Sequence, residues 1–131
     1  MAHATANIGK ARYRVEIKAG EHALVADEGP QLGGQDTGPA PYDLLLAGLG
    51  ACTSITLKMY AERKGWDLTG LRVELKLRRD PDKTHIHRTL HIEGALDADQ
   101  RARLADIAER TPVTLTLKAG AEILTELAPL S

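Results

Sequence analysis

The chain has 131 residues, 43% of them apolar and 27% charged, and is therefore sized for a single globular domain spanning residues 1–131. Its 17 basic and 18 acidic residues leave a formal charge of -1, which gives no electrostatic basis for binding nucleic acid or an anionic membrane. Because Cys52 is the single cysteine, a disulfide within the chain and a cysteine-rich zinc module are both excluded.

We expect no signal peptide at the start of this sequence. Residues 1–10 are small and polar and lack the apolar core of a signal peptide, so we expect a flexible N-terminal segment there. The longest uncharged stretch, residues 44–57, is shorter than the ~20 residues that a helix needs to cross a bilayer. We therefore expect a cytoplasmic protein without a membrane partner.

The first third of the chain reads as two strands and a loop. Apolar and charged residues alternate over residues 11–18, which predicts a half-buried strand. Gly20 can turn the chain into a second short strand over residues 22–26. Residues 27–41 hold four glycines and three prolines and predict a long loop, which in a compact domain is often functional.

A long helix is predicted over residues 42–64. Pro41 suits its start and Gly65 its end. Its first half is apolar all round, which is typical of a helix surrounded by protein, and Gly48 and Gly50 cost about 1 kcal/mol each relative to alanine, so close approach by another element is expected. The small-residue stripe that could receive the same helix of a second subunit consists of Ala47, Gly48, Ala51, Cys52 and Ile55.

The second half of the chain predicts a hairpin, two helices and a last strand. Residues 71–78 alternate, residues 80–83 can turn, and residues 84–93 return with Ile86, Leu90 and Ile92 facing inward. Asp97 and Gln100 form a capping-box pattern for a helix reaching residue 110, and residues 111–120 predict a shorter helix. With a strand over residues 121–127, the pattern predicts an α+β fold, with a curved antiparallel sheet backing the helices.

Cys52 is the first candidate for chemistry, and the residues alone leave its role open between a reactive thiolate and an inert core side chain. It lies well past the first turn of its predicted helix, whose dipole therefore gives it little help. Asp43 precedes it by nine residues, about 13.5 Å along a helix, so the two could meet only across a subunit interface. Arg14, like Arg12, lies on the polar face of the first strand.

Three histidines form another candidate cluster. His85, His87 and His91 share the outward face of one predicted strand, and a pair spaced by one residue can bind zinc or copper. A structural or catalytic site needs three or four ligands, whereas His91 lies about 13 Å from His87 at strand rise. We therefore expect an exposed polar face, with no metal and no cofactor.

Residues 38–53, reading Gly-Pro-Ala-Pro-Tyr-Asp-Leu-Leu-Leu-Ala-Gly-Leu-Gly-Ala-Cys-Thr, resemble the central-helix signature of the osmotically inducible protein C (OsmC) and organic hydroperoxide resistance (Ohr) family. Residues 59–66, 97–116 and 122–127 fit the same family, so the resemblance covers nearly the whole chain from about Tyr13 onward. It implies an intertwined α+β homodimer, in which curved antiparallel sheets pack on central helices and the thiol lies at the subunit interface.

The resemblance also implies roles for single residues. Cys52 falls on the peroxidatic position, whose thiol attacks a hydroperoxide and becomes a sulfenic acid. The resolving cysteine usually stands in a Cys-Pro-Val-His run, which here begins at Thr111 and ends at Thr114. The family's catalytic glutamate follows the proline that starts the helix, where this chain has Tyr42, and Asp43 is the nearest acid.

The family's catalytic arginine comes from the N-terminal hairpin, for which we choose Arg14. A first hypothesis for function is an oxidative-stress protein that reduces (organic) hydroperoxides with Cys52 as its one thiol and an external thiol as reductant. The alternative is a dimer that binds a small apolar ligand at the subunit interface without turnover. Pocket and interface positions in both cases are Tyr42, Ala47, Gly48, Ala51, Ile55, Thr111 and Thr114.

Overall fold

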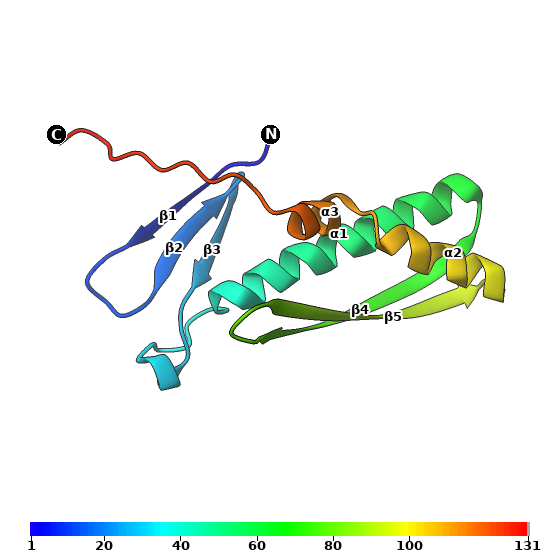
Figure 1. Ribbon diagram of the computed structural model, residues 1–131, viewed down its shortest axis with the longest axis horizontal. Coiled ribbons are helices and arrows are strands. Elements are labelled where there is room, and N and C mark those ends of the chain that lie inside the picture. Colours follow the sequence, from blue (N-terminus) through cyan, green and yellow to red (C-terminus); the bar gives the residue numbers. More distant parts are fainter. Residues whose placement is uncertain (131) are drawn as a thin grey trace. The chain divides into compact units, whose positions relative to one another are not determined.

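The computed structural model describes residues 1–130, which form the antiparallel strands and the helices of an α+β fold (Figure 1). Three strands form one antiparallel sheet in the order β1-β2-β3, and β4 and β5 form a second, two-stranded sheet. The elements in chain order are β1 (Ala4–Ile8), β2 (Val15–Ala19), β3 (His22–Ala26), the short 3-10 helix η1 (Pro30–Leu32), α1 (Pro41–Lys64), β4 (Asp67–Arg79), β5 (Thr84–Ala95), α2 (Ala98–Ala108) and α3 (Pro112–Ala119). The predicted α+β class is confirmed.

The chain forms two compact units, which are described one by one. The first comprises Met1–Gly48 and Lys76–Ile86, and thus holds β1 to β3, the start of α1 and the tip of the β4–β5 hairpin. The second comprises Leu49–Leu75 and the chain from His87 onward, and thus holds most of α1, the base of the hairpin, α2 and α3. The single domain over residues 1–131 stays a prediction.

In the first unit, β2 pairs with β1 on one side and with β3 on the other. The alternation that predicted a strand over residues 11–18 is realised from Val15 onward, where positions along β2 alternate between half-buried and exposed. Residues 4–8, expected within a flexible N-terminal segment, form β1 and pair with β2 from Ala4 opposite Ala19 to Ile8 opposite Val15. Every residue of β1 is exposed, so the sequence contains no alternation of buried apolar residues that would predict this strand.

The loop after β3 is ordered by the buried carboxylate of Asp27. Its Oδ1 accepts hydrogen bonds from the backbone N–H of Tyr13 (3.1 Å) and Glu28 (2.7 Å). Its Oδ2 accepts hydrogen bonds from the N–H (3.1 Å) and the hydroxyl (2.6 Å) of Thr37. The glycine-rich stretch is therefore a loop as predicted, but one folded around a single side chain and interrupted by η1.

Helix α1 confirms the predicted long helix. It begins at Pro41 and ends at Lys64, and Gly65 follows with a φ of +71°, the left-handed conformation that favours glycine after a helix. Its buried residues form a single stripe of Leu49, Thr53, Leu57 and Ala61. Much of the rest of this apolar helix is exposed, including Ile55 at 55% and Met59 at 57%.

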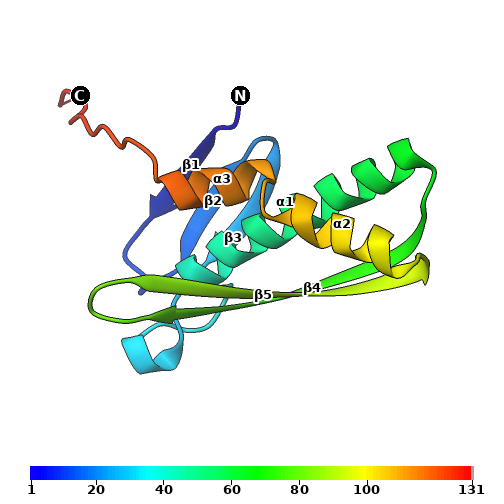
Figure 2. The same ribbon diagram turned by 45° about the vertical axis from the view of Figure 1, so that its right-hand side comes forward.

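The core of the second unit lies between α1, α2 and the base of the hairpin (Figure 2). Leu57 and Ala61 of α1 pack there with Leu68 of β4 and with Leu104 and Ala108 of α2. Each buried leucine side chain stabilises the folded state by roughly 1.5–3 kcal/mol relative to leaving it exposed. This cluster holds the C-terminal half of α1 in place, and Cys52 lies just over one turn before Leu57.

The predicted hairpin and both predicted helices that follow it are confirmed. The capping box forms as expected, with Asp97 Oδ1 accepting from Gln100 N–H and Gln100 Oε1 accepting from Asp97 N–H. Helix α2 ends at Ala108 rather than at residue 110, because the N–H groups of Glu109 and Arg110 close a turn instead. Helix α3 starts at Pro112 and ends before Gly120.

The strand expected over residues 121–127 is wrong. Residues 120–130 carry no regular secondary structure, and Ile123, Leu124 and Leu127 are 84–97% exposed (red in Figure 1). A strand forms only where another strand satisfies its backbone N–H and C=O groups. Within residues 1–130, the three-stranded and two-stranded sheets do not include this segment.

Helix α1 is also, by length and composition, long and apolar enough to cross a membrane, with a mean hydropathy of 1.4 over its most apolar stretch. The uncharged stretch of residues 44–57 alone is too short to cross a bilayer, but the helix continues beyond that stretch to Lys64. A single helix of this kind is a weak indication of a membrane, because the central helix of a soluble protein has the same composition.

Candidate functional site

The thiol of Cys52 lies half-buried on α1 in the second unit. Its Sγ is 3.9 Å from the hydroxyl oxygen of Thr56, one turn further along the helix. A second contact comes from the other end of the sequence, where the backbone N–H of Val113 donates to Sγ at an N···S distance of 3.5 Å. The thiol therefore has a directed backbone donor.

The donor belongs to the first turn of α3. Thr111 is the residue before the helix, Pro112 its first residue and Val113 its second, so the Val113 N–H has no acceptor within the helix. The N-terminus of a helix carries partial positive charge and favours an anion beside it. The dipole of α1 gives Cys52 little help, as expected, but α3 supplies a helix N-terminus that the sequence reasoning missed.

The two positions that the family resemblance aligns with a resolving cysteine and a histidine, Thr111 and Thr114, form a buried hydroxyl pair. Thr111 is fully buried and Thr114 is 5% exposed, and their hydroxyl oxygens are 2.6 Å apart. Thr114 also donates to the carbonyl of Ala108 at the end of α2 (3.3 Å). Both positions lie in the second unit with Cys52, beside its donor Val113.

Arg88 is the site residue that the sequence reasoning missed. It lies on β5, and its side chain is 12% exposed. Its Nη1 donates to the hydroxyls of Thr53 and Thr114, each at 2.9 Å. The signal was present in the sequence: Arg88 occupies the same alternating register as Ile86, Leu90 and Ile92, so a charged residue stood on the face assigned to the core.

A carboxylate at the end of α2 balances the Arg88 charge. Nη2 of Arg88 donates to the Ala108 carbonyl at 2.8 Å and to Glu109 Oε2 at 3.4 Å. A hydrogen bond from Lys118 lowers the pKa of the Glu109 carboxyl below its usual value, and the charge of Arg88 adds to this effect. Glu109 is therefore ionised near neutral pH.

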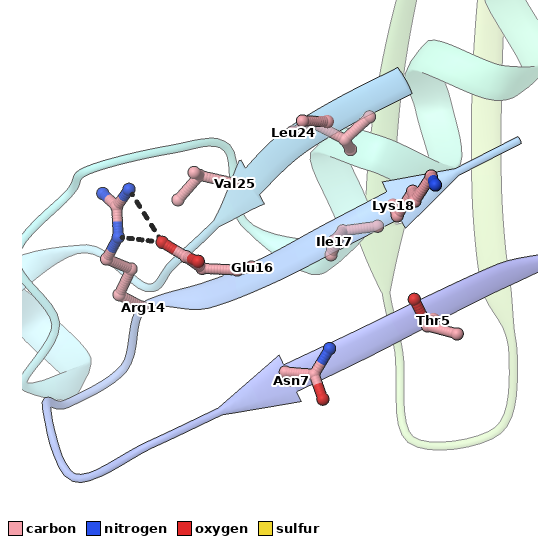
Figure 3. A pocket seen from close by; sticks show the side chains of 9 residues that line it. Thr5, Asn7, Arg14, Glu16, Ile17, Lys18, Leu24 and Val25 are labelled. Atoms are coloured by element: carbon pink, nitrogen blue, oxygen red, sulfur yellow. Dashed lines mark hydrogen bonds and ion pairs between the residues drawn. The ribbon is translucent and has the colours of Figure 1, made fainter. Parts of the chain in front are cut away.

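Arg14 lies in the first unit, in a hollow of about 400 Å³ on the three-stranded sheet (Figure 3). Its guanidinium points toward Glu16, with Nε and Nη2 each 3.4 Å from Glu16 Oε1. The two side chains are 44% and 71% exposed. A role for Arg14 in activating Cys52 stays a prediction.

Tyr42 and Asp43 open α1, also in the first unit. Asp43 Oδ2 accepts a hydrogen bond from the Ala40 N–H (3.2 Å), so this carboxylate caps the helix that it begins. The Arg79 guanidinium lies 5.3 Å from the centre of the Tyr42 ring, a cation–π arrangement. The capping contact gives Asp43 a structural role, and its partnership with Cys52 stays a prediction.

The small-residue stripe of α1 is exposed at Ala47, Gly48, Ala51 and Ile55. The expected close approach to the glycines is found at Gly50, where an added Cβ would lie 2.9 Å from Leu75 Cδ1. Around Gly48 an added Cβ would meet nothing within 4 Å. The two glycines therefore face different surroundings, one the hairpin and the other open space.

Two of the three histidines lie beside separate carboxylates. His85 Nε2 lies 3.1 Å from Asp80 in the first unit, while His91 pairs with Glu74 in the second. Among residues 1–130, no group of three or more His, Cys, Asp or Glu side chains is placed to hold a metal ion.

Solved structures similar to this chain share its fold. An OsmC-like protein from Mycoplasma pneumoniae has a TM-score of 0.78 at 20% identity, covering 90% of this chain and 87% of that one. An organic hydroperoxide resistance protein OsmC from Legionella pneumophila has a TM-score of 0.65 at 23% identity, covering 90% and 89%. The organic hydroperoxide resistance protein OhrB of Bacillus subtilis has a TM-score of 0.60 at 24% identity, covering 88% and 90%.

No curated protein matches the chain. The family model for OsmC-like proteins, in contrast, matches residues 34–126, which is well over half of the sequence. The match includes α1 with Cys52, the hairpin with Arg88, and both helices that follow. This protein therefore belongs to the OsmC-like protein family.

Proposed function

We propose that this protein is a cytoplasmic, thiol-dependent reductase of organic hydroperoxides that uses Cys52 as its only redox-active cysteine. The observation that supports it most is the placement of Cys52, half-buried on the family's central helix with the Val113 N–H aimed at its sulfur. The names of the Legionella and Bacillus relatives, both organic hydroperoxide resistance proteins, support the same substrate class.

The proposed reaction needs one thiol on the protein and two from outside. The Cys52 thiolate attacks the terminal oxygen of the hydroperoxide, the O–O bond breaks, and the alcohol leaves after taking up a proton. Sulfur is oxidised by two electrons to a sulfenic acid. An external thiol then attacks this sulfur and releases water, and a second external thiol resolves the mixed disulfide, which regenerates Cys52 and yields an external disulfide.

The residue at the resolving position supports the external route. Thr111 has a hydroxyl where the family usually has a thiol, and that hydroxyl is buried against Thr114. A hydroxyl cannot form a disulfide with an oxidised cysteine. An oxidised Cys52 would therefore be reduced by an external thiol that reaches the exposed part of its side chain.

We also propose that the protein acts as a homodimer. The exposed apolar face of α1 and the exposed leucines and isoleucine of residues 121–130 support this, because soluble proteins rarely leave contiguous apolar surface uncovered. A second copy of the chain would cover the Ala47, Gly48, Ala51 and Ile55 stripe. This assembly is the one that the family resemblance implies.

The decisive experiment measures consumption of tert-butyl hydroperoxide with a dithiol as reductant. We expect the wild-type protein to consume it, Cys52→Ser to lose at least ~100-fold in kcat/KM, and mass spectrometry to detect one added oxygen on Cys52. Ser54→Ala is the matched control on the same helix, since within residues 1–130 its hydroxyl bonds only the Gly50 carbonyl (2.8 Å). A wild-type protein whose Cys52 does not react with the hydroperoxide would refute the proposal.

A further inference from the structure

Arg88 joins the two helices that meet at Cys52. Thr53, which accepts one N–H of Arg88 Nη1, is the residue after Cys52 on α1. Thr114, which accepts the other, is the residue after Val113 on α3. Nη1 of Arg88 thus bonds the residue that follows Cys52 and the residue that follows Val113. Cys52 and Val113 themselves are in contact, with an N···S distance of 3.5 Å.

The hydrogen bonds of the network are mutually consistent. The Thr53 hydroxyl gives its proton to the Leu49 carbonyl (2.7 Å) and accepts from Arg88. The Thr114 hydroxyl gives its proton to Ala108 O and accepts from Arg88, leaving Thr111 free to donate to it. Among the described residues, no buried side-chain nitrogen or oxygen lacks a partner. A fully satisfied buried network of this kind fixes one geometry.

We propose that Arg88 is the positioning residue of Cys52: it sets the distance between α1 and the first turn of α3, and so holds the Val113 N–H on the sulfur. The kinetic part of this inference rests on the proposed function, whereas the contact between Val113 and Cys52 can be measured without it. Arg88 acts through Thr53 and Thr114 and is not itself assigned a contact with substrate.

The shape of the arginine is essential to this role. Four of its five N–H groups are used, two from Nη1 and two from Nη2, and they reach α1, the end of α2 and α3 at once. Lysine has the same charge but a single nitrogen on a flexible stem, which cannot span these acceptors. Charge alone therefore does not replace Arg88.

Burying the Arg88 guanidinium also costs free energy of desolvation, which an apolar side chain at this position would not. Taking a guanidinium largely out of water is unfavourable unless a counterion and hydrogen bonds compensate. Here Glu109, at 3.4 Å, and three neutral acceptors do so. An apolar residue at position 88 would fit the core-facing register, so the polar network is explained better by the geometry that it imposes on Cys52 and Val113.

The consequence for chemistry lies in the anionic states of sulfur. A thiolate before attack and a sulfenate after it both carry negative charge that a fixed N–H donor stabilises. If α3 could slide by about 1 Å, the donor would be lost from the sulfur, and misplacement on that scale slows reactions up to about 100-fold. Arg88 prevents this movement.

The test compares Arg88→Gln and Arg88→Lys with the wild-type protein and with Arg101→Gln. Arg101 is the matched control, because it donates to one carbonyl, that of Ile92 (3.0 Å), in the same unit. We expect both Arg88 variants to oxidise Cys52 with tert-butyl hydroperoxide about tenfold more slowly, and the control to stay within about twofold of wild type. Failure of lysine to rescue the rate separates geometry from charge.

A second readout does not depend on peroxide. In the wild-type background, Cys52→Ser replaces sulfur as the acceptor and should shift the Val113 amide resonance in an ¹H–¹⁵N spectrum. In the Arg88→Gln background the same substitution should leave that resonance nearly unmoved, because the contact is already lost. A residue that only stabilises the fold would lower Tm without uncoupling these two positions.

The outcomes separate the two proposals. A wild-type protein that ignores hydroperoxide refutes the proposed function, and the amide measurement then decides the role of Arg88 alone. Wild-type oxidation rates in both Arg88 variants, or an unchanged response of Val113 to Cys52→Ser, would overturn the inference even if Tm falls. If Arg88→Gln does not fold, Thr114→Val is used instead, because it removes one acceptor of the Arg88 guanidinium. It is tested by the same two measurements, the oxidation rate of Cys52 and the shift of the Val113 amide resonance.

Discussion

Asp27 carries the most strongly shifted carboxyl among the described residues of the first unit. The hydrogen bond from the Thr37 hydroxyl is the largest cause that lowers the pKa of Asp27, and the N–H groups of Thr37, Glu28 and Tyr13 lower it further against the opposing effect of burial. The folded state thus binds a proton to Asp27 less readily than the unfolded state. The resulting stability is present above about pH 4 and is lost as the pH falls below that value.

We therefore predict that Thr37→Val flattens the pH dependence of folding. Without the hydroxyl, the pKa of Asp27 rises toward its unfolded value, so the variant should be less stable at pH 7 and lose less stability between pH 5 and pH 2. Urea unfolding across this range measures the difference. Thr89→Val, at an exposed position of β5, is the control, and a Thr37→Val slope equal to that of wild type would contradict the assignment.

At the level of single residues, the sequence indicates Cys52 as a candidate, whose role stays a prediction, but it does not indicate the surroundings of the thiol. Cys52 stood out as the single cysteine on a recognisable helix, and Thr111 and Thr114 as altered motif positions. The donor to Cys52 is a backbone N–H that lies 61 residues away in the sequence. Nearly every residue type carries a backbone N–H, so the sequence cannot indicate which one contacts the thiol. The sequence does indicate Arg88, because a charged residue there occupies the half-buried register of β5.

The helices and the hairpin were predictable because their signals are local. Pro41 and Gly65 bound α1, and the capping box opens α2 within four residues. The predictions were wrong for β1, where a strand forms and none was expected, and for the segment after Gly120, where a strand was expected and none forms. Both errors have one cause, because the pairing of a strand depends on a neighbouring strand as well as on its own residues. Apolar residues in a segment, as over residues 121–127, indicate a surface that can be buried but not what buries it.

The capping box gives a prediction for α2. Asp97→Ala removes the acceptor of the Gln100 N–H (2.8 Å) and should lower the free energy of unfolding by about 1 kcal/mol. Asp99→Ala, in the first turn of the same helix, loses only the interaction with the helix dipole and should cost a few tenths of a kcal/mol, about 0.3–0.5. Equal losses in chemical denaturation would show that the box does not act as a cap.

The whole molecule leaves much of its apolar surface uncovered as a single chain. Of the long apolar helix α1, one stripe is buried, and Ile55 and Met59 are both more than half exposed. The proposed homodimer would bury this face, and it would also explain why a glycine is present at position 48, where this chain itself leaves open space. Small residues let two helices approach closely.

We predict that Gly48→Arg converts the protein from dimer to monomer. The arginine has room within the chain, since an added Cβ meets nothing within 4 Å, but a facing helix would meet its charge and bulk. Light scattering coupled to size-exclusion chromatography measures the mass, with Thr89→Arg as an exposed control on β5. A wild-type protein that runs as a monomer at micromolar concentration would refute the dimer.

The donation from Val113 to Cys52 makes the thiol's environment tolerant of genetic change. Any residue except proline at position 113 supplies the same N–H, so side chains at Thr111 and in the first turn of α3 can change without removing the donor from the sulfur. Under the proposed function, the backbone therefore supplies the donor for the first step, the oxidation of Cys52, whereas the recycling step depends on side chains that can be replaced.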